Sequence, residues 1–104
     1  MSDFFTHSID IPADHPCFEG HFPGFPVFPA VAQLSLLTEA IAILHGGRCV
    51  IAAIASAKFL SPLGPGATVI VELRQRGDNS IDFVIRTAAL VVAKGKLTYR
   101  MVEP

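Results

Sequence analysis

The sequence has few charged residues and no long hydrophobic run. Only 16 % of its 104 residues are charged, against roughly 25 % in a typical soluble chain, while 51 % are hydrophobic. A small domain with so little charge is expected to bury part of its surface against another subunit. No apolar run reaches the roughly 18 residues of a transmembrane helix, so no membrane partner is expected.

The chain also lacks an excess of charge of either sign and a cysteine pattern that would bind a metal. The net charge of −1 gives no sign of nucleic-acid binding, and Cys17 and Cys49 fit no metal spacing, so both are interpreted as free thiols. Asp3, His7 and Asp10 interrupt the N-terminal segment, which therefore does not resemble a signal peptide, and a cytoplasmic location is expected. The chain has no internal repeat, and its length suits a single domain covering residues 1–104.

Proline and glycine are concentrated in one loop. Five of the eight prolines fall between Pro12 and Pro29, which predicts a segment that is stiff without being regular. Gly20 and Gly24 supply the backbone freedom that its turns need. A stiff loop that carries histidine and aromatic side chains is suited to holding a functional site in place.

Periodicity predicts one helix after this loop, from about Pro29 to His45, with Gly46 and Gly47 at its end. Apolar residues surround the helix, which predicts burial on most of its sides. Its polar residues are exceptions to this pattern. Ser35, Thr38 and Glu39 share one stripe, and Gln33 points elsewhere.

Alternating apolar residues predict five strands, at residues 4–11, 50–59, 67–75, 80–86 and about 91–101. In the first strand, Phe5, His7 and Ile9 share one face. The order of elements favours an α+β fold, in which a strongly bent antiparallel sheet wraps around one apolar helix.

Two motifs resemble those of one enzyme family. Residues 20–24 read Gly-His-Phe-Pro-Gly, and residues 26–30 read Pro-Val-Phe-Pro-Ala. They resemble the active-site signature of the β-hydroxyacyl-acyl-carrier-protein dehydratases, which is Gly-His-Phe-Pro-Gly followed by Pro-Val-Met-Pro-Gly at the start of the central helix. Residues 57–66, Ala-Lys-Phe-Leu-Ser-Pro-Leu-Gly-Pro-Gly, resemble a strand and turn of the same family. A narrower likeness is to the short dehydratase-like proteins found with aryl-polyene and related lipid clusters.

The resemblance covers nearly the whole chain and implies a hotdog fold that forms a homodimer. Each of two interface sites would take a histidine from one protomer and an acid from the central helix of the other. The family histidine maps onto His21, the glycine at the helix start onto Ala30, and the acid onto Ser35. The implied substrate is an acyl chain on the phosphopantetheine arm of an acyl carrier protein. No metal or organic cofactor is implied.

Dehydration of a 3-hydroxyacyl thioester needs a base at C2, an acid at the C3 hydroxyl and donors for the thioester oxygen. His21 suits the base, because the unperturbed pKa of histidine is near neutral. Backbone N–H groups near Ala30 and Val31 suit the donors. The substrate-binding residues predicted around them are Phe22, Gly24, Phe28, Ala30 and Val31. The phenylalanines either line an acyl tunnel or form the core of the loop.

Ser35 is the main departure from the family pattern, because its hydroxyl cannot act as a carboxylate. Losing a positioned acid typically lowers the rate by about 10²–10⁴-fold. Glu39, roughly 6 Å farther along the helix, is one replacement. A second possible replacement is a water molecule held by Ser35. A third is an acid from a different hotdog protein in a heterodimer. The structural alternatives are that Ser35 bonds to its own helix and that Glu39 pairs with Lys or Arg or reaches solvent.

Three functions therefore remain open. The first is a dehydratase or isomerase of carrier-bound acyl chains, and the second is a thioesterase on the same fold. The third is a non-catalytic or heterodimer-dependent acyl-binding subunit, which Ser35 and Ala30 favour. Of the other histidines, His7 and His15 are interpreted as surface or packing residues, and His45 as a cap at the helix C-terminus.

Overall fold

A computed structural model describes residues 4–12, 14 and 30–102 of the chain. One helix and five strands follow one another in the order β1 (Phe4–Asp10), α1 (Ala30–His45), β2 (Cys49–Phe59), β3 (Thr68–Gln75), β4 (Ser80–Arg86) and β5 (Val91–Met101). Every predicted element is present close to its expected bounds. No helix in the described part of the chain is long and apolar enough to cross a membrane.

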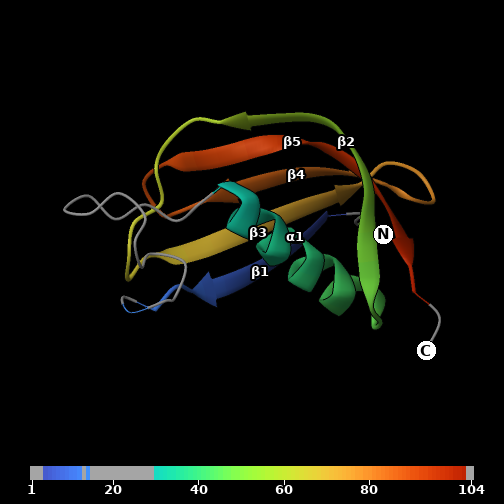
Figure 1. Ribbon diagram of the computed structural model, residues 1–104, viewed down its shortest axis with the longest axis horizontal. Helices are drawn as coiled ribbons and strands as arrows, with labels where there is room; N and C mark the ends of the chain where they lie inside the picture. The colour runs from blue at the N-terminus through green and yellow to red at the C-terminus, as the bar shows by residue number, and fades with distance from the viewer. Residues whose placement is uncertain (1–3, 13, 15–29, 103–104) are drawn as a thin grey trace.

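The strands form one antiparallel sheet in the order β1-β3-β4-β5-β2. Strands β3, β4 and β5 are neighbours both in sequence and in space. The two strands that flank α1 in the sequence, β1 and β2, form the two edges of the sheet. Figure 1 shows α1 lying across one face of this sheet. The α+β prediction, with a sheet around one helix, is confirmed.

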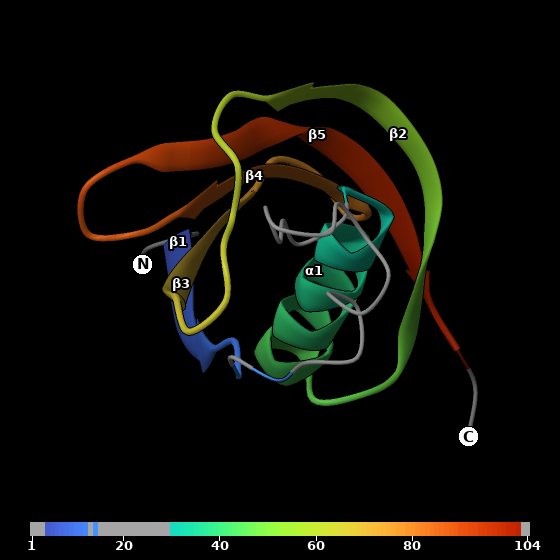
Figure 2. The same ribbon diagram turned by 60° about the vertical axis from the view of Figure 1, so that its left-hand side comes forward.

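The curvature of the sheet has a local cause in β2. Its pairing with β5 shifts register between Ile51 and Ala53 and again between Ile54 and Ser56. Such irregularities bend a strand and increase its twist. Figure 2 shows the result, because β1 and β3 lie on one side of α1 while β2 curves around the other. One sheet thereby covers the helix on several sides.

The core lies between α1 and the inner face of the sheet. The expected alternation is observed in β3 and β4, where every second residue is buried. On the helix, Leu37, Ala40 and Ile41 are fully buried. The strand residues of this core are Cys49, Val69, Val71, Leu73, Ile81, Phe83, Ile85, Val92, Ala93, Leu97 and Tyr99.

The sheet leaves one stripe of α1 uncovered. Ser35, Glu39 and Ile43 are exposed, and their spacing of four residues places them on one face of the helix. Ile43 keeps 50 % of its surface exposed although it is apolar. The expected burial on most sides therefore holds for the face toward the sheet and does not hold for this stripe.

The C-terminal end of α1 is built as the sequence predicts. Gly46 has φ = 71°, and the Gly47 N–H donates to the Ala42 carbonyl at 3.1 Å, an arrangement that satisfies the last turn of the helix. His45 is a basic residue in the last turn of α1, as expected, and its side chain also makes contacts that the sequence did not predict. Its Nε2 lies 2.7 Å from the hydroxyl of buried Tyr99 and 3.2 Å from Gln75 Oε1, so the side chain joins the helix end to β5 and β3.

Gly95 of β5 occupies a point where the backbone and a ring leave no room for a side chain. It pairs with Ala57 of β2 and Phe83 of β4. A Cβ at this position would lie 2.9 Å from the Ala57 Cα and 2.9 Å from the Phe83 ring, and closer still to the Ser56 carbonyl oxygen. The close approach of β2 to β5 therefore depends on a glycine here.

We expect Gly95→Ala to lower the free energy of unfolding by about 1–3 kcal/mol, because two of the three close contacts are backbone atoms that cannot move aside cheaply. Gly64→Ala is the matched control, since its Cβ would meet nothing within 4 Å. Chemical denaturation of both variants measures the difference. Equal stability of the two variants would contradict the packing argument.

Candidate functional site

The predicted site residues divide into two groups. His21, Phe22, Gly24 and Phe28 lie outside the residues that the structure describes. Ala30 and Val31 form the first turn of α1, and Ser35 and Glu39 follow on the same helix. The described part of the site is therefore the N-terminal half of α1 with the sheet that faces it.

The start of α1 at Ala30 has a direct chemical consequence. The first four N–H groups of a helix have no partner within the helix, and the helix dipole places partial positive charge at that end. Such groups stabilise negative charge on an oxygen atom. The helix begins at Ala30, close to the position that the sequence predicted, and the donor role expected near Ala30 and Val31 stays a prediction.

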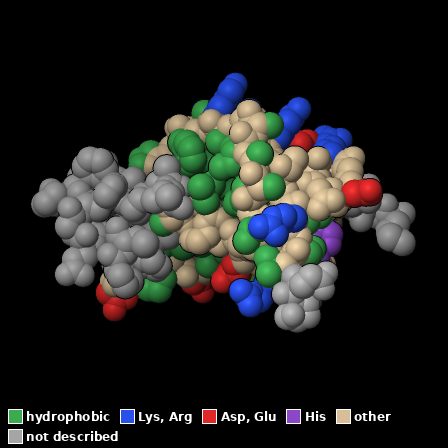
Figure 3. Space-filling view, turned by 45° about the vertical axis from the view of Figure 1, so that its right-hand side comes forward, with side chains coloured by type: hydrophobic (Ala, Val, Ile, Leu, Met, Phe, Trp, Pro, Cys, Tyr) green, Lys and Arg blue, Asp and Glu red, His purple; other side chains and the backbone are tan. Residues whose placement is uncertain are grey.

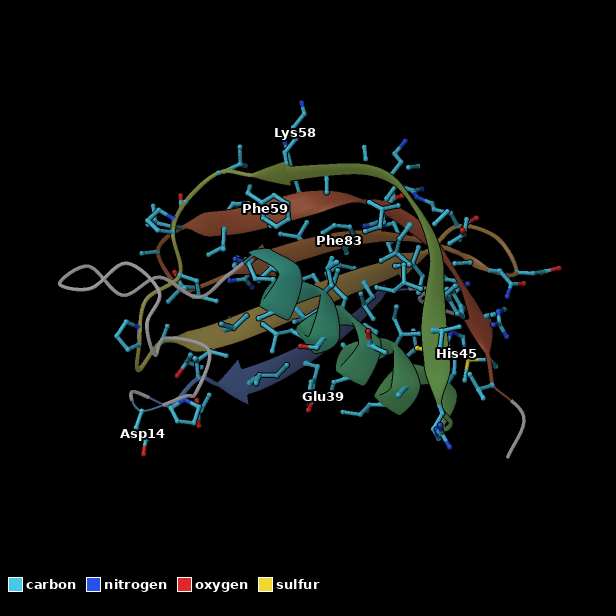
Figure 4. The ribbon with its side chains drawn as sticks, viewed as in Figure 1. Asp14, Glu39, His45, Lys58, Phe59 and Phe83 are labelled. Carbon is cyan, nitrogen blue, oxygen red and sulfur yellow. The ribbon has the colours of Figure 1, made fainter. Side chains whose placement is uncertain are left out.

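At the end of β2, an aromatic side chain lies on the helix side of the sheet. Figure 4 shows Phe59 on the side that faces α1 and Lys58 on the opposite side. Phe59 remains 49 % exposed, and Leu60 after it remains 53 % exposed. An exposed aromatic ring on the helix side of the sheet is suited to contact with an acyl chain.

Ser35 makes the contact that its structural interpretation predicted. Its hydroxyl donates to the Ala32 carbonyl oxygen at 2.6 Å, within the same helix, and the residue is exposed. A serine bonded in this way holds its only proton on its own backbone. The chain thus presents no carboxylate at the position where the resemblance implies one.

Glu39 lies one turn beyond Ser35 on the same stripe. One of its carboxylate oxygens is 3.4 Å from Nε2 of His7 on β1, and its side chain is 54 % exposed. Figure 4 shows Glu39 pointing from α1 to the same side as β1. The expected alternatives were a Lys or Arg partner or solvent. In the structure, the Glu39 side chain is exposed to solvent and has a histidine as its partner.

Two features of this region were not foreseen. The alternation of β1 placed His7 on one face with Phe5 and Ile9, and the structure has these three residues as the less exposed ones, but the contact of His7 with Glu39 was not predicted. Gln33 was expected to point away from the polar stripe, and it is in fact 4 % exposed, with an Oε1 that has no hydrogen-bond partner in the described part of the structure. The sequence signal for this burial was the position of Gln33 on the helix, away from the stripe of Ser35, Thr38 and Glu39.

The charged residues of the strands lie mainly on the outer face of the sheet, as expected. Arg86 pairs with Glu72 at 3.0 Å, and Arg76 pairs with Asp82 at 2.7 Å. A hollow of about 320 Å³ on this face is bordered by the three lysines of β2 and β5, which are Lys58, Lys94 and Lys96. Because α1 lies on the other face, this hollow is separate from the helix start.

Cys49 is a free thiol, as expected, and it is buried. Its Sγ donates to the Thr38 carbonyl at 3.6 Å, and burial raises the pKa of the thiol above its ordinary value. A buried thiol with a raised pKa is a poor nucleophile. Cys17 lies outside the described residues. Among those described, no three His, Cys, Asp or Glu side chains gather closely enough to hold a metal ion.

Comparison with known proteins agrees with the fold and the motifs. Residues 2–96 match the ApeI-like family model, described as ApeI dehydratase. The chain belongs to the ApeI-like dehydratase family. It is also 34 % identical over 100 residues to the 3-hydroxyacyl-(acyl-carrier-protein) dehydratase FabZ of Haemophilus influenzae, an alignment that covers 85 % of this chain and 68 % of that protein.

Other relatives match over a shorter part. FabZ of Thermus thermophilus is 36 % identical over 67 residues, which cover 57 % of this chain and 47 % of that enzyme. The chain spans about half the length of several curated relatives that it matches. The match to dehydratases confirms the resemblance that the Gly-His-Phe-Pro-Gly segment indicated.

Solved structures establish the hotdog fold. The dehydratase heterocomplex ApeI:P from Xenorhabdus doucetiae superposes with a TM-score of 0.81 at 22 % identity, over 95 % of this chain and 88 % of that chain. The fluoroacetyl-CoA thioesterase FlK, as its T42A mutant, superposes with a TM-score of 0.76 at 21 % identity, over 97 % of this chain and 87 % of that chain. Both a dehydratase and a thioesterase therefore share this fold.

Proposed function

We propose that the protein is a 3-hydroxyacyl-thioester dehydratase that acts on acyl chains carried by an acyl carrier protein, in fatty-acid or polyketide-type lipid synthesis in the cytoplasm. The observation that carries this proposal is the Gly-His-Phe-Pro-Gly segment, which leads into a helix that begins at Ala30 within a hotdog fold. Membership of a dehydratase family supports it.

The proposed reaction removes water across C2 and C3 of the acyl chain. His21 takes a proton from C2, the C2–C3 double bond forms, and the C3–O bond breaks as the hydroxyl leaves with an added proton. The products are a 2-enoyl thioester and water. N–H groups at Ala30 and Val31 stabilise the thioester oxygen as it gains negative charge. Phe22, Gly24 and Phe28 are the other proposed substrate contacts.

We assign the proton donor for the leaving hydroxyl to Glu39. Ser35 donates its proton to its own helix, whereas Glu39 offers a carboxyl group on the uncovered stripe of α1, which in its protonated form donates the proton and is left as a carboxylate. His7 holds this carboxylate from β1 at 3.4 Å. In a dimer, Glu39 of one protomer would serve the site whose His21 belongs to the other.

A dimer is supported by what the chain leaves exposed. β2 is an edge strand, and its unpaired backbone groups are a template for pairing with another chain. Val50, Ile54 and Phe59 of this strand are large exposed hydrophobic residues. Figure 3 shows hydrophobic side chains gathered across one face of the molecule. A homodimer would cover this edge together with the exposed stripe of α1.

The alternative is a subunit that needs a different hotdog chain to supply the acid. The local bond of Ser35 favours it, and the ApeI:P structure is a heterocomplex by its description. A thioesterase is the other alternative on this fold. Its products would be a free acid and a free thiol instead of an enoyl thioester.

The first test measures dehydration directly. Purified protein is incubated with 3-hydroxyacyl chains on an acyl carrier protein, and mass spectrometry follows the loss of water. We expect a 2-enoyl product, and we expect His21→Ala to lower its rate by about 10²–10⁴-fold. A free acid as product would identify a thioesterase. No turnover by the wild type across several chain lengths would contradict a stand-alone enzyme.

The second test addresses the acid. We expect Glu39→Gln to lower kcat by about 10²–10⁴-fold, because the amide cannot donate the proton that the leaving hydroxyl needs. His7→Gln serves as the matched control, since it removes the partner and keeps the carboxylate. We expect Ser35→Glu in the Glu39→Gln background to restore activity. Full activity of Glu39→Gln would assign the acid to another chain.

The third test addresses assembly. We expect the wild type to sediment as a dimer and Ile54→Lys to sediment as a monomer, because a buried unpaired ammonium at the edge strand is costly. Leu90→Lys is the control, since Leu90 is 57 % exposed but lies outside β2. Analytical ultracentrifugation distinguishes the two. A wild type that is monomeric alone and dimeric with an acid-bearing hotdog protein would favour the heterodimer.

A further inference from the structure

Gln33 carries the one buried side-chain oxygen or nitrogen without a hydrogen-bond partner among the described residues. It lies near the start of α1 and is 4 % exposed, and its Oε1 has no hydrogen-bond partner among the described residues. Nearby polar groups on the helix are satisfied, since Ser35 bonds to the Ala32 carbonyl and Thr38 bonds to the Leu34 carbonyl. Gln33 alone therefore keeps a buried acceptor that lacks a donor.

This acceptor has no role in stabilising the fold. A buried polar group without a partner destabilises a protein, and an apolar side chain of similar length would avoid that loss. Residues next to Gln33 on the inner face, such as Leu36 and Leu37, are apolar and buried. A buried polar group without a partner calls for an explanation, and a role at a functional site is one such explanation.

Gln33 lies near the N-terminal end of α1, and this is the end at which a ligand would meet it. Gln33 belongs to the first turn of α1, which begins at Ala30, and long side chains on a helix generally lean toward its N-terminus. That turn carries backbone N–H groups without partners in the helix. An acceptor and donors within one turn would suit a group that both donates and accepts a hydrogen bond.

We propose that Gln33 Oε1 accepts a hydrogen bond from the 3-hydroxyl of the substrate and is the residue that selects 3-hydroxyacyl chains. The inference rests on the proposed dehydratase function, which supplies a substrate with one such hydroxyl. By holding the hydroxyl proton, Gln33 directs a lone pair of the hydroxyl oxygen toward the acid that protonates it. Gln33 is therefore a positioning residue, since it takes no proton itself.

A binding experiment tests this without requiring turnover. The probes are pantetheine amides, in which N–H replaces the thioester sulfur, carrying an octanoyl chain, a 3-hydroxyoctanoyl chain or an octanoyl chain with its hydroxyl at the far end. Calorimetry measures the Kd of each probe for the full-length protein in its native assembly. The variants are Gln33→Met, which keeps length and helix propensity, and Leu36→Met as a matched control.

We expect the wild type and Leu36→Met to bind the 3-hydroxy probe about 10- to 100-fold more tightly than the plain octanoyl probe, because a site built to bond a hydroxyl rejects the analogue without it. Gln33→Met should bind both equally. It should also raise Tm by about 4–8 °C in the absence of ligand, because the unpaired acceptor is gone.

Three outcomes would overturn the assignment. The first is a wild type without preference for the 3-hydroxyl, or with the same preference for the distal hydroxyl. The second is a Gln33→Met variant that keeps the preference. The third is a fall in its Tm, which would mean that water or a partner subunit already satisfies the amide. A protein that binds the 3-hydroxy probe selectively but does not dehydrate its thioester would contradict the proposed function and leave this site intact.

Discussion

The structure depends on the burial of one helix that is apolar on most of its sides. Leu37, Ala40 and Ile41 of α1 have no exposed surface, and a flat sheet could not enclose them together with their neighbours. The sheet must therefore bend, and the irregular pairing of β2 with β5 provides the bend. Gly95 lets the strands approach at the same place. The position of the helix start, and with it the site, follows from this enclosure.

Local patterns were sufficient to predict the elements and a sheet wrapped around one helix. Alternation in β3 and β4 reflects one face against the helix and one face against water, so the buried residues could be read from the sequence. Gly46 marked the end of α1 because glycine adopts the left-handed backbone conformation found there without steric strain. The order of the strands in the sheet, with β1 and β2 at its edges, was not predicted from the sequence.

Contacts between distant residues could not be predicted in the same way. His45 has the position of a helix cap, yet Tyr99, more than fifty residues away, offers its hydroxyl at 2.7 Å. His7 meets Glu39 only because β1 packs beside α1. Residues 15–29, which carry His21, lie outside the described part, so the geometry around that histidine remains a prediction from the motif.

The exposed and the buried side of α1 carry different polar groups. The stripe with Ser35 and Glu39 is exposed, and it carries the carboxyl group that we propose as the proton donor. The opposite side is closed by the sheet and carries the unpaired acceptor of Gln33. A substrate at the helix start of one protomer would meet that protomer's Gln33 and its partner's stripe. Under the proposed function, replacement of the family acid by Ser35 would move the proton donor one turn along the helix, to Glu39, and the helix start would still stabilise the thioester oxygen.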